Sequence, residues 1–188
     1  MKKSFFNLFI AVLLLAACSK STDPFLITSN QVGYLTKEIK VKQLDSLFIN
    51  DSIVKVLAEN NPMSTNDQIE IYEKGGDKLM VLSVKKNNDP ESKISNIQIF
   101  DDRFKTNKGI HLKSTFKDVT DKYEVSSIAN TLNSLVISLK DTDVYLIIDK
   151  EVLSFDLRTQ IGAKVEVYDI PENAKIKFLM VGWEGSDD

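Results

Sequence analysis

The sequence has only one cysteine, Cys18, and one histidine, His111, among its 188 residues. A structural zinc site of cysteine and histidine requires several of these ligands, and an intrachain disulfide requires a second thiol, so both are excluded. Any catalytic arrangement of the Ser-His-Asp or Cys-His type would have to use His111. A metal site in this chain would therefore need oxygen ligands.

Long apolar runs are also scarce, and the clearest one spans Phe5 to Ala17, interrupted only by Asn7. It follows Lys2 and Lys3, which gives the order of a positive n-region and an apolar h-region. As a helix, its 13 residues would span about 20 Å, which is short of the ~30 Å hydrocarbon core of a bilayer. We therefore predict that residues 1–17 are a cleavable signal peptide rather than a membrane span.

This run ends in Leu15-Ala16-Ala17-Cys18, which resembles the lipobox of bacterial lipoproteins. The resemblance implies a diacylglycerol on the Cys18 thiol, cleavage before Cys18, and acylation of the new amine by a fatty acid such as palmitate. Each buried CH₂ contributes ~0.8 kcal/mol, so two or three acyl chains would anchor the protein stably. The alternative is an ordinary secretory signal with an incidental cysteine.

Residues 18–24 are polar and form the predicted lipidated tether between membrane and fold. Ser19 stands where lipoproteins that stay at the inner membrane of enteric bacteria carry aspartate. The resemblance to that sorting rule favours the outer membrane. No dense acidic run follows Cys18, which favours a periplasm-facing protein. The inner membrane and the cell surface are the alternatives.

The charge balance argues against nucleic acid as a partner. Because Lys2 and Lys3 are two of the 24 basic residues, the mature chain has 22 basic against 27 acidic side chains, a formal charge of −5. That balance disfavours electrostatic binding to phosphates. Lysines at 37, 40 and 42 and at 105, 108 and 113 are interleaved with acidic or apolar residues, so we interpret them as solvated surface. The alternative is a contact with lipid A phosphates or an acidic partner.

Alternation of apolar and polar residues predicts that most of the remaining chain is β-strand. Residues 68–84 read as a hairpin, because Gly75-Gly76-Asp77 separates two alternating segments. Further strands are expected near 53–56, 94–100, 125–128, 134–140, 144–149 and 175–183, with a short one at 165–168.

Two segments have the apolar spacing of amphipathic helices, Val41 to Phe48 and Ser114 to Tyr123. In the second, Ser114 or Thr115 supplies the N-cap. Many strands and two helices predict an α+β fold, in which antiparallel sheets carry two amphipathic helices packed on one face.

The two helices occur in similar surroundings, each preceded by a glycine loop and followed by strands. Gly33 begins the first copy and Gly109 the second, which predicts a tandem β-α-β-β-β pseudo-repeat. The predicted halves are residues 25–100 and 101–188, either as two units or as one continuous domain. Chance repetition of this order is the alternative, since α+β chains often show it.

Residues Gly109-Ile110, Ser114-Thr115, Val119 and Tyr123 are similar to the turn-helix of BamE/SmpA-like outer-membrane lipoproteins and of beta-lactamase inhibitory protein. The resemblance implies a helical pair packed on an antiparallel sheet, repeated in tandem in the second protein. It also implies a binding or scaffolding role rather than catalysis.

Phosphate-binding loops, dinucleotide fingerprints and Ca²⁺ loops are missing from the sequence, so we expect no cofactor and no metal. Trp183 is interpreted as a core or rim residue rather than a sugar platform. Two carboxylates suffice for glycoside hydrolysis, so a small carboxylate-dependent hydrolase stays open as an alternative. Such an enzyme would need a deep polar pocket that holds a carboxylate with a raised pKa. A lipid or ligand carrier with an apolar cavity is a third class.

The leading hypothesis is a non-enzymatic, membrane-anchored lipoprotein whose periplasmic α+β domain binds an envelope protein or assists envelope assembly. Its oligomeric state is left open. Function usually lies in loops on a rigid scaffold, so the two glycine-to-helix loops are the predicted contact sites. Their candidate partner-binding residues are Tyr34, Thr36, Ile110, His111 and Lys113.

Overall fold

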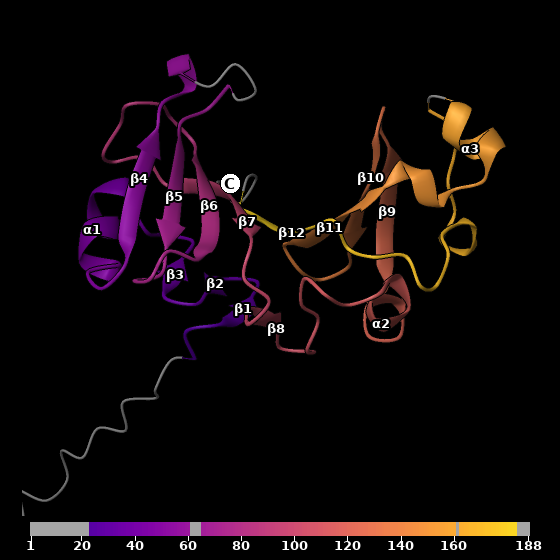
Figure 1. The fold of residues 1–188 in the computed structure, drawn as a ribbon, viewed down its shortest axis with the longest axis horizontal. Coiled ribbons are helices and arrows are strands. Elements are labelled where there is room, and N and C mark those ends of the chain that lie inside the picture. Colours follow the sequence, from indigo (N-terminus) through magenta and orange to yellow (C-terminus); the bar gives the residue numbers. More distant parts are fainter. Residues whose placement is uncertain (1–22, 61–64, 161, 184–188) are drawn as a thin grey trace, which may run out of the picture.

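The computed structural model describes residues 23–60, 65–160 and 162–183, drawn in colour in Figure 1. The predicted signal peptide, Cys18 and the tether up to residue 22 lie outside the described residues. Twelve strands and three short α-helices occur in the described ranges. The fold is α+β with mostly antiparallel sheets, which confirms the α+β class of the prediction.

Eight strands form the main sheet in the order β4-β5-β6-β7-β12-β11-β10-β9, and all neighbours in it are antiparallel. In chain order these are β4 (Ser52–Val56), β5 (Gln68–Tyr72), β6 (Lys78–Val84), β7 (Ile94–Ile99), β9 (Val125–Asn130), β10 (Ser134–Leu139), β11 (Val144–Asp149) and β12 (Phe178–Gly182). Each predicted half supplies four strands. The halves are joined where β7 pairs with β12, so the sheet is continuous across them.

A second sheet has the order β3-β2-β1-β8 and also combines both halves. Its strands are β1 (Leu26–Thr28), β2 (Gln31–Val32), β3 (Leu35–Thr36) and β8 (Lys105–Thr106). The parallel pairing of β1 with β8 is the exception to the antiparallel pattern. A single bridge from Lys105 to His111 extends this small sheet on the β8 side.

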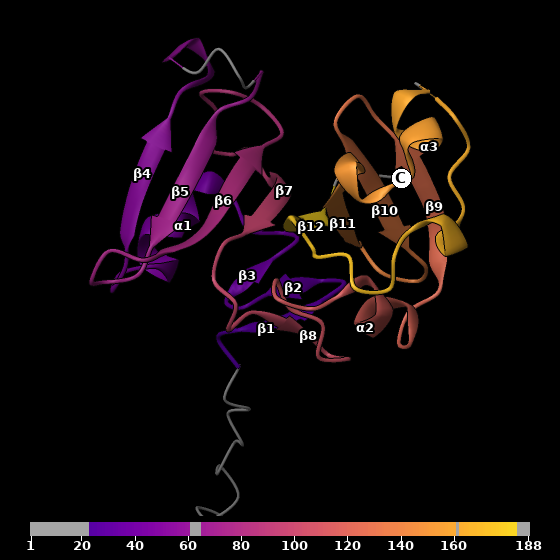
Figure 2. The ribbon, with the colours of Figure 1, turned by 45° about the vertical axis from the view of Figure 1, so that its right-hand side comes forward.

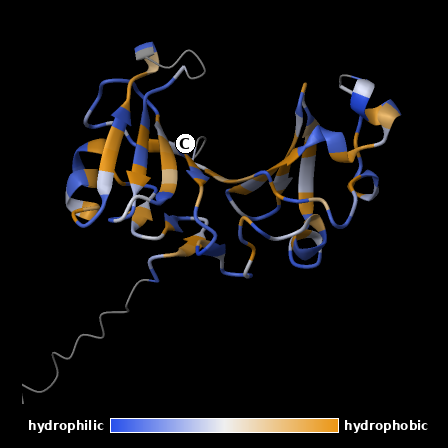
Figure 3. Cartoon of the chain, in the orientation of Figure 1, coloured by the Kyte–Doolittle hydropathy of each residue, from blue (hydrophilic) through white to orange (hydrophobic). Residues whose placement is uncertain are grey.

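Burial alternates along β5, β10, β11 and β12, so these strands have one covered face and one partly accessible face, whereas on β6 Leu79 to Leu82 are all buried. In β10, for example, Leu135 and Ile137 are fully buried while Val136 is partly exposed. The same alternation recurs in β5, β11 and β12, and Figure 3 shows the mixture of hydrophobic and hydrophilic residues along the strands. An antiparallel sheet with one packed and one accessible face produces this pattern.

The small sheet lies against the covered face. Figures 1 and 2 show the main sheet bent, with β7 and β12 at the base of the bend and the small sheet below that base. Buried residues of the small sheet, such as Ile27 and Val32, belong to the same core cluster as Ile99 and Leu179 of the main sheet. The uncovered face therefore lines the inside of the bend.

Both predicted helical segments contain helix, but each helix is short. The first comprises the 3-10 turn η1 (Val41–Gln43) and α1 (Leu44–Leu47), and the second is α2 (Phe116–Thr120). Leu44, Phe116 and Val119 are buried, as the apolar spacing indicates. Thr115 caps α2 because its hydroxyl accepts a hydrogen bond from the Asp118 backbone N–H, while the Asp118 carboxylate accepts one from the Thr115 N–H.

Residues 150–177 depart from the prediction in two ways. A third helix, α3 (Phe155–Thr159), was not predicted, since its Phe155 is exposed and gives no clear apolar stripe. The strand predicted at 165–168 is wrong, because η4 (Val167–Asp169) is a 3-10 turn. The Asp169 carboxylate accepts a hydrogen bond from the Glu166 backbone N–H at 2.9 Å, which closes this turn instead of a ladder. Two further 3-10 turns are η2 (Ala58–Asn60) and η3 (Lys150–Val152).

Candidate functional site

The accessible side of the main sheet, which we call the open face, carries one row of side chains that crosses all eight strands. Paired positions in the register define the row. Its members, from β4 to β9, are Val54, Glu70, Val81, Gln98, Met180, Tyr145, Ser138 and Ser127.

The second half of the open face is mainly apolar and the first half is richer in amides. Val136, Ile147 and Phe178 lie side by side on β10, β11 and β12, and all three are partly exposed. On β7 the corresponding face carries Asn96 and Gln98. A surface that combines aromatic, aliphatic and amide side chains with few charges resembles the central part of a protein–protein interface.

Charge on the open face is locally compensated at Glu70. Its carboxylate accepts hydrogen bonds from the Tyr72 hydroxyl at 2.5 Å and from the Lys78 ammonium at 2.9 Å. These two donors, with the Tyr72 hydroxyl as the larger influence, lower the pKa of Glu70 below its usual value. Lys78 also lies 5.2 Å from the centroids of both the Tyr72 and Phe100 rings. The opposite charges of Glu70 and Lys78 therefore leave this patch nearly neutral.

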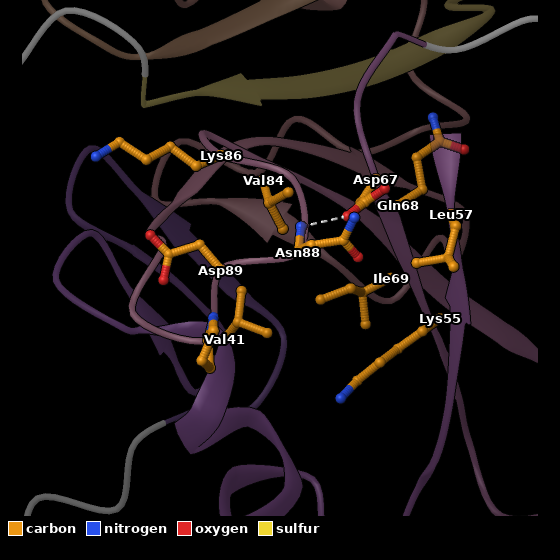
Figure 4. A pocket seen from close by; sticks show the side chains of 11 residues that line it. Val41, Lys55, Leu57, Asp67, Gln68, Ile69, Val84, Lys86, Asn88 and Asp89 are labelled. Atoms are coloured by element: carbon orange, nitrogen blue, oxygen red, sulfur yellow. Dashed lines mark hydrogen bonds between the residues drawn. The ribbon is translucent and has the colours of Figure 1, made fainter. Parts of the chain in front are cut away.

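A pocket of about 220 Å³ lies between η1 and the β4–β5 end of the main sheet (Figure 4). Val41, Ile69 and Val84 line it. The buried Asp67 carboxylate at its inner end accepts hydrogen bonds from the backbone N–H groups of Ala58 at 2.9 Å and Asn88 at 2.7 Å, the latter marked in Figure 4. Asp67 therefore holds two loops together, and the rest of the pocket is mostly apolar.

A second pocket, of about 280 Å³, lies where the small sheet meets α1 and the β5–β6 hairpin. We call it the Tyr34 pocket. Its lining residues are Pro24, Phe25, Gly33, Tyr34, Leu47, Phe48, Asn50, Asp51, Glu73, Leu79, Met80 and Phe104. The Phe25 and Phe104 rings pack edge to face with centroids 5.1 Å apart.

The two acidic residues of the Tyr34 pocket have different environments. Arg103 donates to both carboxylate oxygens of Glu73, at 3.0 and 2.9 Å, while its guanidinium lies 4.3 Å from the Phe25 ring centroid. Asp51 has no ion pair with a lysine or arginine among the described residues. Burial raises the pKa of the Asp51 carboxyl, the nearby Glu73 charge raises it further, and a hydrogen bond from the Lys74 backbone opposes both.

The predicted contact residues do not form a single site. Tyr34 and Thr36 are exposed at the β2–β3 edge of the small sheet, and of these two Tyr34 lines the pocket that holds Asp51 and Glu73. His111 and Lys113 lie beyond the opposite edge, past β8, where Lys113 pairs with Asp102. Ile110 is fully buried, so its prediction as a partner contact is wrong. Its main chain closes a turn with Thr106, which drives the side chain into the core.

The His111 side chain forms no hydrogen bond or ion pair with another described residue. Its ring Nδ1 is buried without a hydrogen-bond partner, and no carboxylate contacts the ring in the part of the chain that the structure describes. The described ranges also contain no cluster of three histidine, cysteine, aspartate or glutamate side chains that could hold a metal ion. No helix in those ranges combines the length and hydropathy that a membrane crossing needs.

Sequence reasoning proposed Tyr34 as a contact residue, and it did not propose Asp51, Glu73 or the open face. Asp51 follows the first helix and Glu73 ends a strand, so nothing local marks them as a pair. The alternation within single strands could indicate which residues share a face, because Glu70, Tyr145 and Ile147 lie at every second position of the predicted strands. Their common surface depends on the register between β7 and β12.

The fold places the chain among α+β proteins built on a large antiparallel sheet. A scan of protein-family models and a search of curated proteins found no match for it. Among solved structures, it is similar to the crystal structure of the uncharacterized protein yfeY from Escherichia coli. The identity is 16% and the TM-score 0.52, over 83% of this chain and 98% of that chain. At this identity the likeness concerns the fold alone.

Proposed function

We propose that the protein is a lipid-anchored component of the bacterial envelope whose α+β domain binds a protein partner through the open face. The observation that carries this proposal is the row of side chains that crosses all eight strands, whose described members other than Val81 are at least partly exposed. In antiparallel sheets the solvent face is usually polar, whereas here Val136, Ile147 and Phe178 are adjacent and partly exposed.

The lipobox at Leu15 to Cys18 supports the membrane anchor. Between Cys18 and the first described residue, Asp23, the extended chain reaches about 20 Å at most. Such a short tether would hold the domain close to the bilayer and raise its effective concentration for a membrane-associated partner. The sorting resemblance at Ser19 and the missing acidic run favour the periplasmic side of the outer membrane.

We further propose that the two halves are a tandem duplication, each with one amphipathic helix against the covered face. In support, Gly33 and Gly109 both have positive φ, 57° and 79°, and each lies in a tight turn shortly before a helical segment. A Cβ at Gly33 would lie 2.4 Å from the Pro24 carbonyl oxygen, so glycine is required there. Four antiparallel strands complete each half.

A binding role is favoured over carboxylate-dependent hydrolysis for a specific reason. The hydrolase alternative needs two carboxylates free to act on substrate. The Tyr34 pocket does hold Asp51 with a raised pKa, but Arg103 occupies both oxygens of its neighbour Glu73. The proposal therefore assigns no catalytic role to this pair.

Site-specific photo-crosslinking in cells that make the full chain tests the open face. A photoreactive phenylalanine analogue at position 136 or 178 should give one discrete adduct of the same mass, identified by mass spectrometry. The matched control replaces Val167, which is 40% exposed on η4 and away from the open face. Ile147→Arg should abolish the adduct. Equal adducts at 136 and 167, or an adduct insensitive to Ile147→Arg, would remove the open face from the proposal.

A further inference from the structure

The walls of the Tyr34 pocket have the chemistry of a site for organic cations. Phe25, Tyr34 and Phe104 supply ring surfaces, and Leu79 and Met80 supply an aliphatic base. Aromatic faces attract a lysine or arginine head group and also pack against the alkyl stem of such a side chain. Asp51 adds a formal negative charge to the lining.

Asp51 is the unbalanced element of this pocket. A partly buried carboxylate is normally stabilised by a cation or by several donors. Asp51 has one backbone donor, from Lys74, and faces the like charge of Glu73. Arg103 does not relieve it, because its guanidinium is engaged by Glu73 and Asp101. A second cation supplied from outside would remove this imbalance.

Arg103 shows how a cation packs at the rim of the same pocket. Its guanidinium lies over the Phe25 ring and forms a bidentate pair with Glu73. This arrangement combines stacking with two parallel hydrogen bonds, the geometry in which arginine binds carboxylates most tightly. Asp51 and Tyr34 line the same pocket of about 280 Å³ as Glu73, so a second cation could make the same kind of contact there.

We propose that the Tyr34 pocket binds a lysine or arginine side chain presented by a protein partner. The cationic head would pair with Asp51, while its alkyl stem would lie against the exposed Tyr34 ring. Charge complementarity and aromatic walls select such a side chain over an acidic or purely apolar one. The pocket is lined by Met80, which points to the covered face of the main sheet, and by residues next to the small sheet. It is therefore separate from the open face. This second contact extends the proposed function.

Methionine methyl NMR of the full chain, purified from membranes in a non-ionic detergent, provides a direct test. Met80 lines the Tyr34 pocket and Met180 lies on the open face, so one labelled sample reports on both surfaces. The probes are the peptides Gly-Lys-Gly and Gly-Arg-Gly. Gly-norleucine-Gly serves as the uncharged control, and phosphoethanolamine represents a lipid headgroup.

We expect the lysine and arginine peptides to shift the Met80 signal saturably and to leave Met180 unchanged. Asp51→Asn should weaken this binding at least about tenfold, since a charge-assisted hydrogen bond is lost. Asp77→Asn, an exposed acid outside the pocket, should not weaken it. Equal binding of norleucine peptide, unchanged binding by the Asp51→Asn variant, or tighter binding of phosphoethanolamine would each overturn the proposal. None of these results depends on the open face.

Discussion

Tyr145 on β11 lies across Gly182 on β12, and its hydroxyl accepts a hydrogen bond of 2.6 Å from the Asn96 side-chain amide on β7. A Cβ at position 182 would lie 3.3 Å from a ring carbon of Tyr145, so glycine lets the ring pass over the strand. This hydrogen bond spans the junction between the two halves of the main sheet. It adds a side-chain connection to the backbone ladder between β7 and β12.

Tyr145→Phe is expected to lower the free energy of unfolding by about 1 kcal/mol, because the Asn96 amide loses its partner. Urea unfolding followed by circular dichroism measures this change. Tyr168→Phe is the matched control, since Tyr168 is 85% exposed and should tolerate the loss of its hydroxyl. Equal stabilities of the two variants would show that the hydrogen bond contributes nothing to the junction.

Glu70→Gln should destabilise the protein at neutral pH but not at low pH. The Tyr72 hydroxyl and then Lys78 lower the pKa of Glu70 in the folded state, so its stabilising contribution is present above the unfolded pKa, near the ordinary value of 4.5. That contribution is lost as the pH falls through the lowered folded-state pKa. We expect a loss of up to about 1 kcal/mol at pH 7.

Denaturant unfolding of wild type and Glu70→Gln at neutral pH and at successively lower pH values checks this prediction. The difference in unfolding free energy should shrink as the pH is lowered below the unfolded-state pKa. Glu124→Gln is a suitable control, because Glu124 forms an exposed ion pair with Lys140 and such pairs contribute little. A pH-independent difference would indicate lost packing rather than lost charge.

The sequence predicted the local elements well because their signals are local. Gly75-Gly76-Asp77 separates two strands with the expected bounds, and the apolar spacing at Leu44, Phe116 and Val119 placed both helical segments. At residues 165–168 the alternation was misleading, since Asp169 captures the Glu166 N–H in a 3-10 turn. Short-range hydrogen bonding of this kind competes with strand pairing. It leaves no periodic pattern in the sequence from which it could be predicted.

The candidate sites were less predictable because they depend on pairings between distant segments. Tyr34 could be proposed from its loop, but Asp51 and Glu73 meet it only when β1, α1 and the β5–β6 hairpin pack together. Ile110 has the same loop context as Tyr34, yet a turn with Thr106 buries it. Whether a loop residue points outward is decided by the geometry of such turns and by what the loop packs against.

Asp51→Asn is expected to raise stability at neutral pH while it weakens cation binding. Burial and the charge of Glu73 raise the pKa of Asp51 in the folded state, so the ionised carboxylate opposes folding. Stability should therefore fall as the pH rises through the raised folded-state pKa, and the amide should avoid this loss. The expected gain is less than about 1 kcal/mol, since the group is partly solvated.

Thermal unfolding of Asp51→Asn at pH 7 measures the gain in stability. Asp77→Asn, which replaces an exposed acid, is the control. A residue that is kept at a cost to stability is characteristic of a binding site. If the Asp51→Asn variant were less stable than wild type, the carboxylate would be a structural element held by Lys74 instead.

The lipid anchor can be tested independently of any partner. Radiolabelled palmitate should be incorporated into the wild-type protein and not into Cys18→Ser, because Cys18 is the only thiol in the sequence. Ser21→Ala, a change within the same tether, should keep the label. Intact mass spectrometry of the native protein should show a chain that begins at Cys18 and carries two or three acyl groups. A bare thiol, or a leader cut at another bond, would leave the domain a secreted binding protein. The open face and the Tyr34 pocket would then have to recruit their partner without the concentrating effect of a membrane.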